Sequence, residues 1–278
     1  MSNKPESSTG GVSRHVLRLT ESAILLALAT VLSLVKLIDL PYGGSVTAAS
    51  AVPLILLAYR HGVGWGSLAG LAYGLLQLTF SSSLSYVTGF WSVAAVLVLD
   101  FLVAFAAVGV AGLFRRMKSQ PAALLSGAIL YGVLRYAFHV LSGATVWAGI
   151  SIPTAAALAY SFAYNLTYML PETIIAAAGA YFLGSVLNFR SPLPGRLKDK
   201  KAGGTGWLTA LSVGLVTAAV VYDVAAIFPY TQDAETGEFT LSRLGEVAWW
   251  PVVILTALAV LVSVILALVA RRKRVPKT

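Results

Sequence analysis

Four ionisable residues, Asp100, Arg135, His139 and Glu172, lie inside long apolar segments of the sequence. A charged group in hydrocarbon is costly, so such residues usually face a cavity or the interior of a helix bundle. In that setting a carboxylate stabilises a bound cation, and an imidazole adds directional hydrogen bonds. These residue types predict a polar ligand site inside a membrane protein.

The spacing around the histidine predicts one wall of this site. His139, Gly143 and Trp147 recur every four residues, so they share one face of a helix, and Arg135 extends that face inward.

A second segment supplies another polar and aromatic stripe. Tyr160, Tyr164, Tyr168 and Glu172 follow the same four-residue interval, and Asn165 lies beside them. Aromatic stripes in membrane helices also serve ordinary packing, which is the plainer interpretation of Tyr164 and Tyr168.

Depth in the membrane brings these groups together. Counted from the outer ends of the expected helices, Asp100, His139 and Asn165 lie at a similar level, roughly 14 Å in at 1.5 Å per residue. We therefore predict an outward-opening cavity for a small, flat heteroaromatic cation, with each aromatic face adding about 0.5–2 kcal/mol. The structural alternative is that Arg135 pairs with Asp100 or with Glu172.

Several other chemistries lack their motifs. No phosphate-binding glycine loop, metal-ligand cluster, nucleophile–base pair or ATPase signature is recognisable, and the chain has no cysteine. We expect no catalytic residues, no metal and no cofactor. The net charge of +9 would suggest nucleic acid in a soluble protein, but here the basic residues cluster between apolar segments, so no nucleic-acid partner is expected.

The elements that must position the site are transmembrane helices. The 278 residues are 58% hydrophobic and 11% charged, against about 45–50% and about 25% for a soluble domain. About 20 apolar residues cross a hydrocarbon core, so we predict an all-α, polytopic transmembrane helical bundle. The expected spans are Glu21–Ile38, Thr47–Tyr59, Val63–Phe80, Trp91–Phe114, Pro121–Ala148, Thr154–Leu187, Trp207–Pro229 and Val247–Ala270.

Charge sets the expected orientation. Arg60, Arg115, Arg190 and the basic C-terminal run from Arg271 fall on one side of these spans, whereas the loops on the other side are mostly acidic. Because cytoplasmic loops are enriched in Lys and Arg, we predict a multi-pass plasma-membrane protein with both termini cytoplasmic.

Composition divides the chain into four parts. We expect a polar N-terminal tail over residues 1–17, a six-span substrate-binding domain over 18–190, a basic Pro- and Gly-rich linker over 191–206, and a two-span hairpin with a basic cytoplasmic tail over 207–278. Pro171 should kink the sixth span. Gly66, Gly70 and Gly74 predict a close helix contact.

The six-span part resembles a known family from about Arg18 to Leu187. The segments that carry the resemblance are RLTESAILLALA from Arg18, LDFLVAFAAVGVAGLFR from Leu99, RYAFHVLSGATVW from Arg135 and AYSFAYNLTYMLPE from Ala159. They resemble the thiamine-specific S components (ThiT) of energy-coupling factor (ECF) vitamin transporters.

The resemblance implies a six-helix fold and thiamine as the transported ligand. Within it, Asp100 takes the place of an acidic residue near the thiazolium, although it is shorter than the glutamate often found there. The substrate-binding residues that we expect are Asp100, His139, Gly143, Trp147, Tyr160, Asn165 and Glu172, with Tyr86 as a lid candidate in the loop at Ser81–Phe90.

The resemblance also implies protein partners. An S component works with one transmembrane coupling subunit and two cytoplasmic ATPase subunits. A face of small residues on its first helix docks on the coupling subunit, and Ala23 and Ala27 lie at that place here.

Two alternatives stay open at the level of sequence. One is a self-contained permease for a related cationic heterocycle, with the C-terminal hairpin replacing a coupling subunit. The other is an integral-membrane enzyme that uses Asp100, His139 and Glu172 as acid–base groups.

Overall fold

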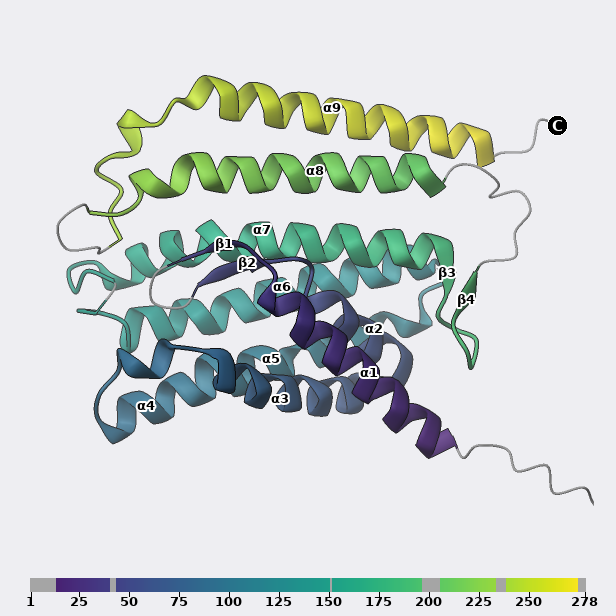
Figure 1. Ribbon diagram of the computed structural model, residues 1–278, viewed down its shortest axis with the longest axis horizontal. Helices are drawn as coiled ribbons and strands as arrows, with labels where there is room; N and C mark the ends of the chain where they lie inside the picture. The colour runs from purple at the N-terminus through teal and green to yellow at the C-terminus, as the bar shows by residue number, and fades with distance from the viewer. Residues whose placement is uncertain (1–13, 41–43, 151, 197–205, 234–238, 275–278) are drawn as a thin grey trace, which may run out of the picture.

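The computed structural model describes residues 14–40, 44–150, 152–196, 206–233 and 239–274. Its long helices run roughly alongside one another, and the start of α1 and the end of α9 lie at the same end of the bundle (Figure 1). Most of the expected N-terminal tail and the greater part of the expected linker fall outside the described residues.

The first helix begins and ends earlier in the chain than the sequence predicts, and the second helix is shorter than predicted. Helix α1 (Arg14–Leu34) is followed by an antiparallel pair of strands, β1 (Lys36–Asp39) and β2 (Ser45–Thr47), and then by α2 (Ala51–His61). The 11 residues of α2 cover about 16 Å, too little to cross a bilayer. Between α1 and α2, the backbone N–H and C=O groups form hydrogen bonds between two strands instead of within a helix. The expected helical spans Glu21–Ile38 and Thr47–Tyr59 are therefore wrong at the ends that face each other.

Helix α3 (Val63–Phe80) has the predicted bounds, and a short turn η2 (Ser83–Ser85) follows it. The fourth span is irregular: α4 (Phe90–Val96) widens into π-helical turns at η3 (Leu97–Val103), and α5 (Ala104–Ala106) then tightens into 3₁₀ turns at η4 (Ala107–Arg116). Asp100 lies in the π-helical turns. Such turns widen the helix locally and are frequent at functional sites.

Helices α6 (Gln120–Thr145) and α7 (Ala157–Val186) pack along each other, and α7 continues through Pro171. The Ser119 side chain caps α6 by accepting a hydrogen bond from the Ala122 N–H at 3.4 Å. Two short strands, β3 (Leu187–Asn188) and β4 (Gly195–Arg196), follow α7.

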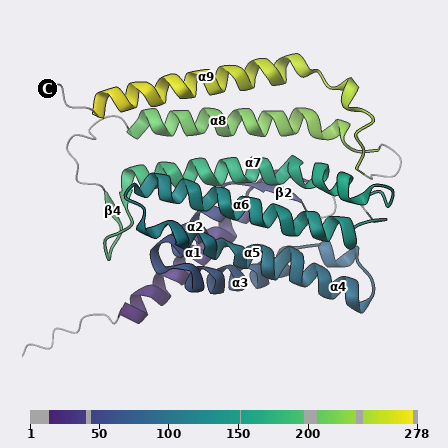
Figure 2. The same cartoon turned by 180° about the vertical axis from the view of Figure 1, so that it is seen from behind.

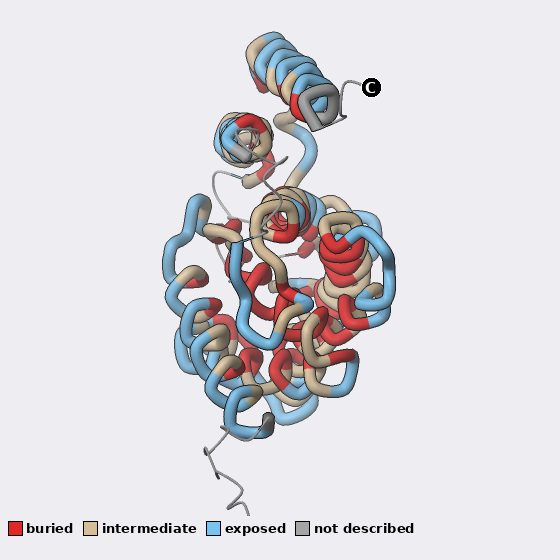
Figure 3. Tube along the Cα trace, turned by 90° about the vertical axis from the view of Figure 1, so that its right-hand side faces the viewer, coloured by how far each residue is buried: buried red, intermediate tan, exposed pale blue. Residues whose placement is uncertain are grey.

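The C-terminal hairpin lies on the flank of α7. It consists of α8 (Gly206–Ile227) and α9 (Trp249–Arg274), joined through the turns η6 (Phe228–Tyr230) and η7 (Leu244–Glu246). Helix α8 packs on α7 and α9 packs on α8, so α9 is the outermost helix (Figures 2 and 3). Reciprocal hydrogen bonds between Ser212 and Ser263, and one from Thr256 to Asp223, join the two helices of the hairpin.

In the described part of the chain, six helical segments are long and apolar enough to cross a membrane: His15–Leu34, Phe90–Arg116, Gln120–Thr145, Ala157–Val186, Trp207–Tyr230 and Trp249–Ala270. The predicted all-α transmembrane bundle is therefore confirmed. Of the eight expected spans, the two that α2 and α3 represent are not among these six segments.

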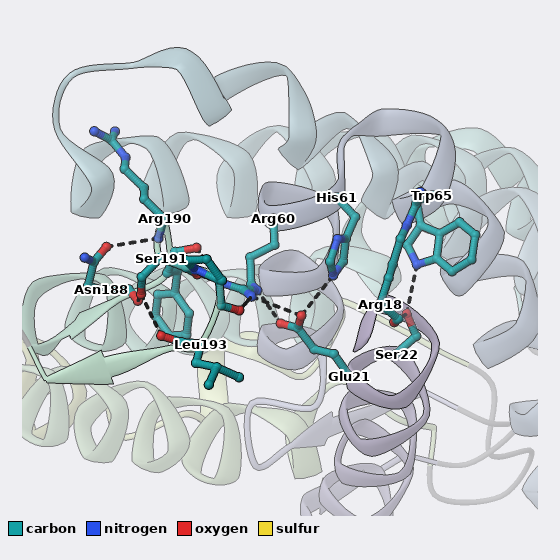
Figure 4. Close-up of polar contacts among 12 residues, drawn as sticks. Arg18, Glu21, Ser22, Arg60, His61, Trp65, Asn188, Arg190, Ser191 and Leu193 are labelled. Carbon is teal, nitrogen blue, oxygen red and sulfur yellow. Dashed lines mark hydrogen bonds and ion pairs between the residues drawn. The ribbon is translucent and has the colours of Figure 1, made fainter. Parts of the chain in front are cut away.

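A polar network fixes the N-terminal half of α1 (Figure 4). Glu21 of α1 forms ion pairs with Arg60 and His61 at the end of α2. Arg60 also donates to the backbone carbonyls of Ser191 and Pro192, at 3.1 and 2.9 Å. The network therefore joins α1 to α2 and to the segment after α7.

The predicted glycine face of α3 is confirmed as a close helix contact. A Cβ atom added at Gly70 would lie 2.2 Å from the Phe105 carbonyl oxygen, and one at Gly74 would lie 2.4 Å from that of Phe101. Glycine at these positions lets α3 approach the segment that carries Asp100.

We predict that Gly70→Ala destabilises the fold, because its methyl group would meet backbone and α3 would have to shift. The expected loss is about 1–3 kcal/mol, the usual range for overpacking. Thermal unfolding in detergent would measure it, with Gly64→Ala as the matched control, because a Cβ at Gly64 meets nothing within 4 Å. Equal melting temperatures for the two variants would contradict the close contact.

Candidate ligand-binding site

A cavity of about 520 Å³ lies inside the bundle, between the β1–β2 hairpin, α3, η3, α6 and α7. Its lining includes most of the residues that the sequence singles out: Tyr86, Asp100, His139, Gly143, Trp147, Asn165 and Glu172. Asp100, His139 and Asn165 come from three different segments, η3, α6 and α7, and all three line this one cavity, as the depth argument predicts.

Asp100 accepts hydrogen bonds from three side chains. The His139 Nδ1 lies 2.9 Å from one carboxylate oxygen, and the Ser142 hydroxyl and the Trp147 indole N–H donate to the other at 2.7 and 3.1 Å. The side chains of Asp100 and His139 are each 12% exposed, so a cavity ligand can reach both. The π-helical turns around Asp100 present the carboxylate to α6.

The two ring nitrogens of His139 have different hydrogen-bonding roles. An ionised carboxylate can only accept, so Nδ1 carries the proton that is shared with Asp100. The Nε2 atom is buried and has no hydrogen-bond partner among the described residues. In the neutral ring, Nε2 is therefore an acceptor that no described residue uses, and the His139 side chain lines the cavity.

Gly143 lets α6 and α7 approach closely beside this pair. A Cβ there would lie 2.2 Å from the Ser161 hydroxyl oxygen and 3.2 Å from the Asn165 side-chain nitrogen. Asn165 donates to the Ser161 carbonyl at 2.9 Å and to the His139 carbonyl at 3.3 Å, and its own oxygen accepts from the Tyr168 hydroxyl at 2.6 Å. The amide of Asn165 is therefore held in one orientation.

Glu172 is 4% exposed and joins the β1–β2 hairpin to α7. The Thr47 backbone N–H and hydroxyl each donate to it at 2.7 Å, and the Ser50 hydroxyl lies 3.4 Å away. Both carboxylate oxygens are thus engaged by protein, although Glu172 also lines the cavity.

Arg135 forms no direct ion pair with Asp100 or Glu172 in the described part of the chain, although the charges of Arg135 and Glu172 are close enough to interact electrostatically. Its guanidinium lies over the Phe105 ring, 4.7 Å from the centroid. It lines the cavity, as do the tyrosines of the α7 stripe, Tyr164 and Tyr168.

Tyr160 is the one predicted site residue that the structure does not place on the cavity wall. Its ring packs edge-on against Phe239, at 6.3 Å between centroids. Phe239 comes from the segment between α8 and α9, which lies outside the six-span region, so a pattern within α7 could not foretell this contact.

The mouth of the cavity is more polar and more exposed. Tyr86 is 44% exposed there, and an ion pair between Lys36 and Asp39 lies on the β1 side. Two further aromatic residues at the end of this loop, Phe90 and Trp91, are 76% and 82% exposed. Only Tyr86 of these three aromatic residues contributes to the lining.

Sequence reasoning missed four residues that position the site. Ser142 and Ser161 hold Asp100 and Asn165, and Thr47 and Ser50 hold Glu172. Ser142 lies three residues after His139, so helical spacing alone could have indicated it. Thr47 and Ser50 precede α2, and no helical periodicity applies to them.

This arrangement suits reversible binding of a flat cation. An acid, an imidazole acceptor and a fixed amide face one cavity with aromatic walls, and its volume is within the usual range of about 300–1,000 Å³ for small-molecule sites. Within the described residues, no group of three or more His, Cys, Asp or Glu residues could hold a metal ion.

Comparisons with known proteins agree with this fold. The family model described as "Thiamine transporter protein (Thia_YuaJ)" matches residues 19–188. The thiamine transporter ThiT of Bacillus subtilis (strain 168) is 34% identical over 177 residues, which cover 59% of this chain and 88% of that protein. A solved structure of ThiT from Listeria monocytogenes aligns with a TM-score of 0.52 at 22% identity, over 62% of this chain and 95% of that one.

We predict that Glu172→Gln lowers the thermal stability of the protein in detergent. The new amide group places its own N–H donors toward the Thr47 donors, and a buried donor left unsatisfied costs about 1–3 kcal/mol. Asp39→Asn is the matched acid-to-amide control, because the Asp39 side chain is 59% exposed. If both variants melted at the wild-type temperature, Glu172 would not hold the β1–β2 hairpin.

Proposed function

The chain belongs to the thiamine transporter protein (Thia_YuaJ) family, and on that premise we propose that it captures thiamine from outside the cell as the substrate-binding subunit of an ECF-type importer. The observation that carries the proposal is the Asp100 carboxylate, held among His139, Ser142 and Trp147 on the wall of a membrane-embedded cavity.

The charge of thiamine complements this acid. Its thiazolium ring is a permanent cation, and a cation near Asp100 offsets the cost of holding a carboxylate in a medium of low dielectric. The aromatic side chains of Trp147, Tyr164 and Tyr168 line the same cavity and can stack on a flat ring or face its charge.

The second ring of thiamine is an aminopyrimidine, which needs an acceptor for its amine. His139 lines the cavity and its Nε2 is an acceptor without a partner among the described residues, so it is the acceptor that we propose for this amine. Asn165 lines the same cavity from α7, with its amide oriented by Ser161 and Tyr168. We therefore assign His139, Gly143 and Asn165 to the pyrimidine end and Asp100 to the thiazolium end.

Unphosphorylated thiamine is the preferred ligand in this proposal. Phosphates would bring negative charge into a cavity whose lining includes Asp39, Asp100 and Glu172, with Lys36 and Arg135 as its cations. Glu172 serves as a positioning residue, because its carboxylate is bound to Thr47 and Ser50.

Energy for import comes from partner subunits in this proposal, because the sequence carries no ATPase signature. Ala23 and Ala27 support a docking face on α1: both are exposed, together with Ile24 and Leu28, while Ser22 and Ala29 face the bundle. Small residues allow close approach of another transmembrane helix. The partners that we propose are one transmembrane coupling subunit and two cytoplasmic ATPase subunits, with both termini of this chain cytoplasmic.

We predict that Asp100→Asn and His139→Ala each weaken thiamine binding to the purified protein. The loss of a buried polar partner costs about 1–3 kcal/mol, or roughly 5- to 150-fold in Kd. Isothermal titration calorimetry in detergent, without ATP, would measure it.

The matched controls for this experiment lie outside the cavity. Asp223→Asn makes the same acid-to-amide change in the C-terminal hairpin, and His15→Ala removes an exposed imidazole on α1. Both should bind thiamine as the wild type does. Wild-type affinity in the Asp100 and His139 variants would refute the site, and no binding by folded wild-type protein would refute the function.

We predict that the double variant Ala23→Leu, Ala27→Leu binds thiamine as tightly as the wild type but loses most of the ATP-dependent uptake. The larger side chains would keep a coupling subunit away from α1. Uptake of labelled thiamine would be compared in cells with and without an ECF module. Ala210→Leu with Ala225→Leu is the control, because these alanines are exposed on α8. Undiminished uptake by the α1 variant, or uptake without any ATPase subunit, would favour a self-contained permease.

A further inference from the structure

We propose that the C-terminal hairpin is part of the ligand site, with Phe239 as a positioning residue for its aromatic wall. The hairpin begins after residue 188, where the family match ends, so this contribution is not carried over from the family. The inference rests on the proposed function, because it concerns how tightly the same cavity holds thiamine.

Phe239 lies between the two outermost tyrosines of α7. It is 2% exposed, and its ring meets Tyr164 edge-on at 5.4 Å and 80° and Tyr160 at 6.3 Å and 86°. Tyr164 lines the cavity, whereas Phe239 does not. Phe239 therefore contacts the outer side of a cavity wall.

The position of Phe239 is set by the end of α8. Gln232 and Phe239 form an isolated antiparallel bridge, and the next residue, Thr240, donates its N–H to the Thr231 carbonyl at 2.9 Å. Thr231 is itself 2% exposed and donates its hydroxyl to the Phe228 carbonyl at 2.8 Å. These backbone contacts hold the segment that carries Phe239 against the end of α8.

From Phe239 a continuous set of contacts leads to the acid of the site. Tyr164 packs on Tyr168 at 5.9 Å, and Tyr168 packs on His139 at 6.2 Å. Tyr168 also donates to Asn165 at 2.6 Å, and His139 is bonded to Asp100. A shift of the Tyr164 ring would therefore change the positions of Asn165, His139 and Asp100, which we assign to thiamine binding.

The hairpin supports a second wall as well. Val221 and Phe228 of the α8 region pack against a buried cluster that joins β1–β2 to α7: Leu40, Val46, Tyr168, Met169 and Ile175. Leu40 and Tyr168 line the cavity. The hairpin thus packs against two walls of the cavity. Phe239 contacts the tyrosines of α7, and the α8 region contacts the cluster at the β1–β2 hairpin.

The test compares full-length variants of Phe239 for the release of labelled thiamine into excess unlabelled thiamine. Phe239→Ala removes the ring, Phe239→Leu removes it while keeping apolar volume, and Phe239→Tyr retains it. Trp250→Ala is the matched control, because Trp250 is an aromatic residue of the same hairpin that is 71% exposed. Calorimetry on the same samples reports the fraction of protein that binds.

We expect release to be roughly 2- to 12-fold faster for Phe239→Ala and Phe239→Leu, which corresponds to one aromatic pair. Phe239→Tyr, which keeps the ring, and Trp250→Ala should both release thiamine at the wild-type rate. A wild-type release rate for both Phe239→Ala and Phe239→Leu would overturn the inference, as would a lower binding fraction with an unchanged rate. Failure of the wild type to bind thiamine would instead overturn the proposed function.

Discussion

The structure depends on keeping one negative charge, that of Asp100, inside a helix bundle. A carboxylate in a low-dielectric interior is tolerated only when donors surround it, and Asp100 has the imidazole of His139, the hydroxyl of Ser142 and the indole of Trp147. All three belong to α6 or the residues just after it, while Asp100 comes from η3. The contact between these two segments is therefore both a structural bond and the electrostatic centre of the site.

That contact requires helices that approach closely, and the small residues of the chain make this possible. Gly70 brings α3 against the backbone at Phe105, and Gly143 brings α6 against Ser161 of α7. Membrane helices gain little from hydrophobic burial against lipid, so packing at short distance and interhelical hydrogen bonds must hold them together. Ser161 serves both needs, because it fits against Gly143 and donates to the Val140 carbonyl.

Sequence reasoning predicted the bundle and most of the named residues that line the cavity, because helical spacing and depth in the membrane can be counted along each helix. Asp100, His139 and Asn165 could be placed at one level by counting residues along their spans. The β1–β2 hairpin could not be foreseen, because its Thr47 is bound by Glu172, which lies 125 residues away in the sequence. Tyr160 was misplaced for the same reason: its neighbour is Phe239, 79 residues later in the chain.

The start of α1 and the C-terminal hairpin lie on different sides of the bundle (Figure 1), and this bears on how the hairpin and a partner can coexist. Helix α8 covers the flank of α7, whereas α1 starts on the side away from the hairpin (Figure 1). Ala23 and Ala27 on α1 are exposed. A subunit that docked on this face of α1 would therefore not need to displace the hairpin. The hairpin and a coupling subunit are then compatible, which favours a supporting role for α8 and α9 over a replacement of that subunit.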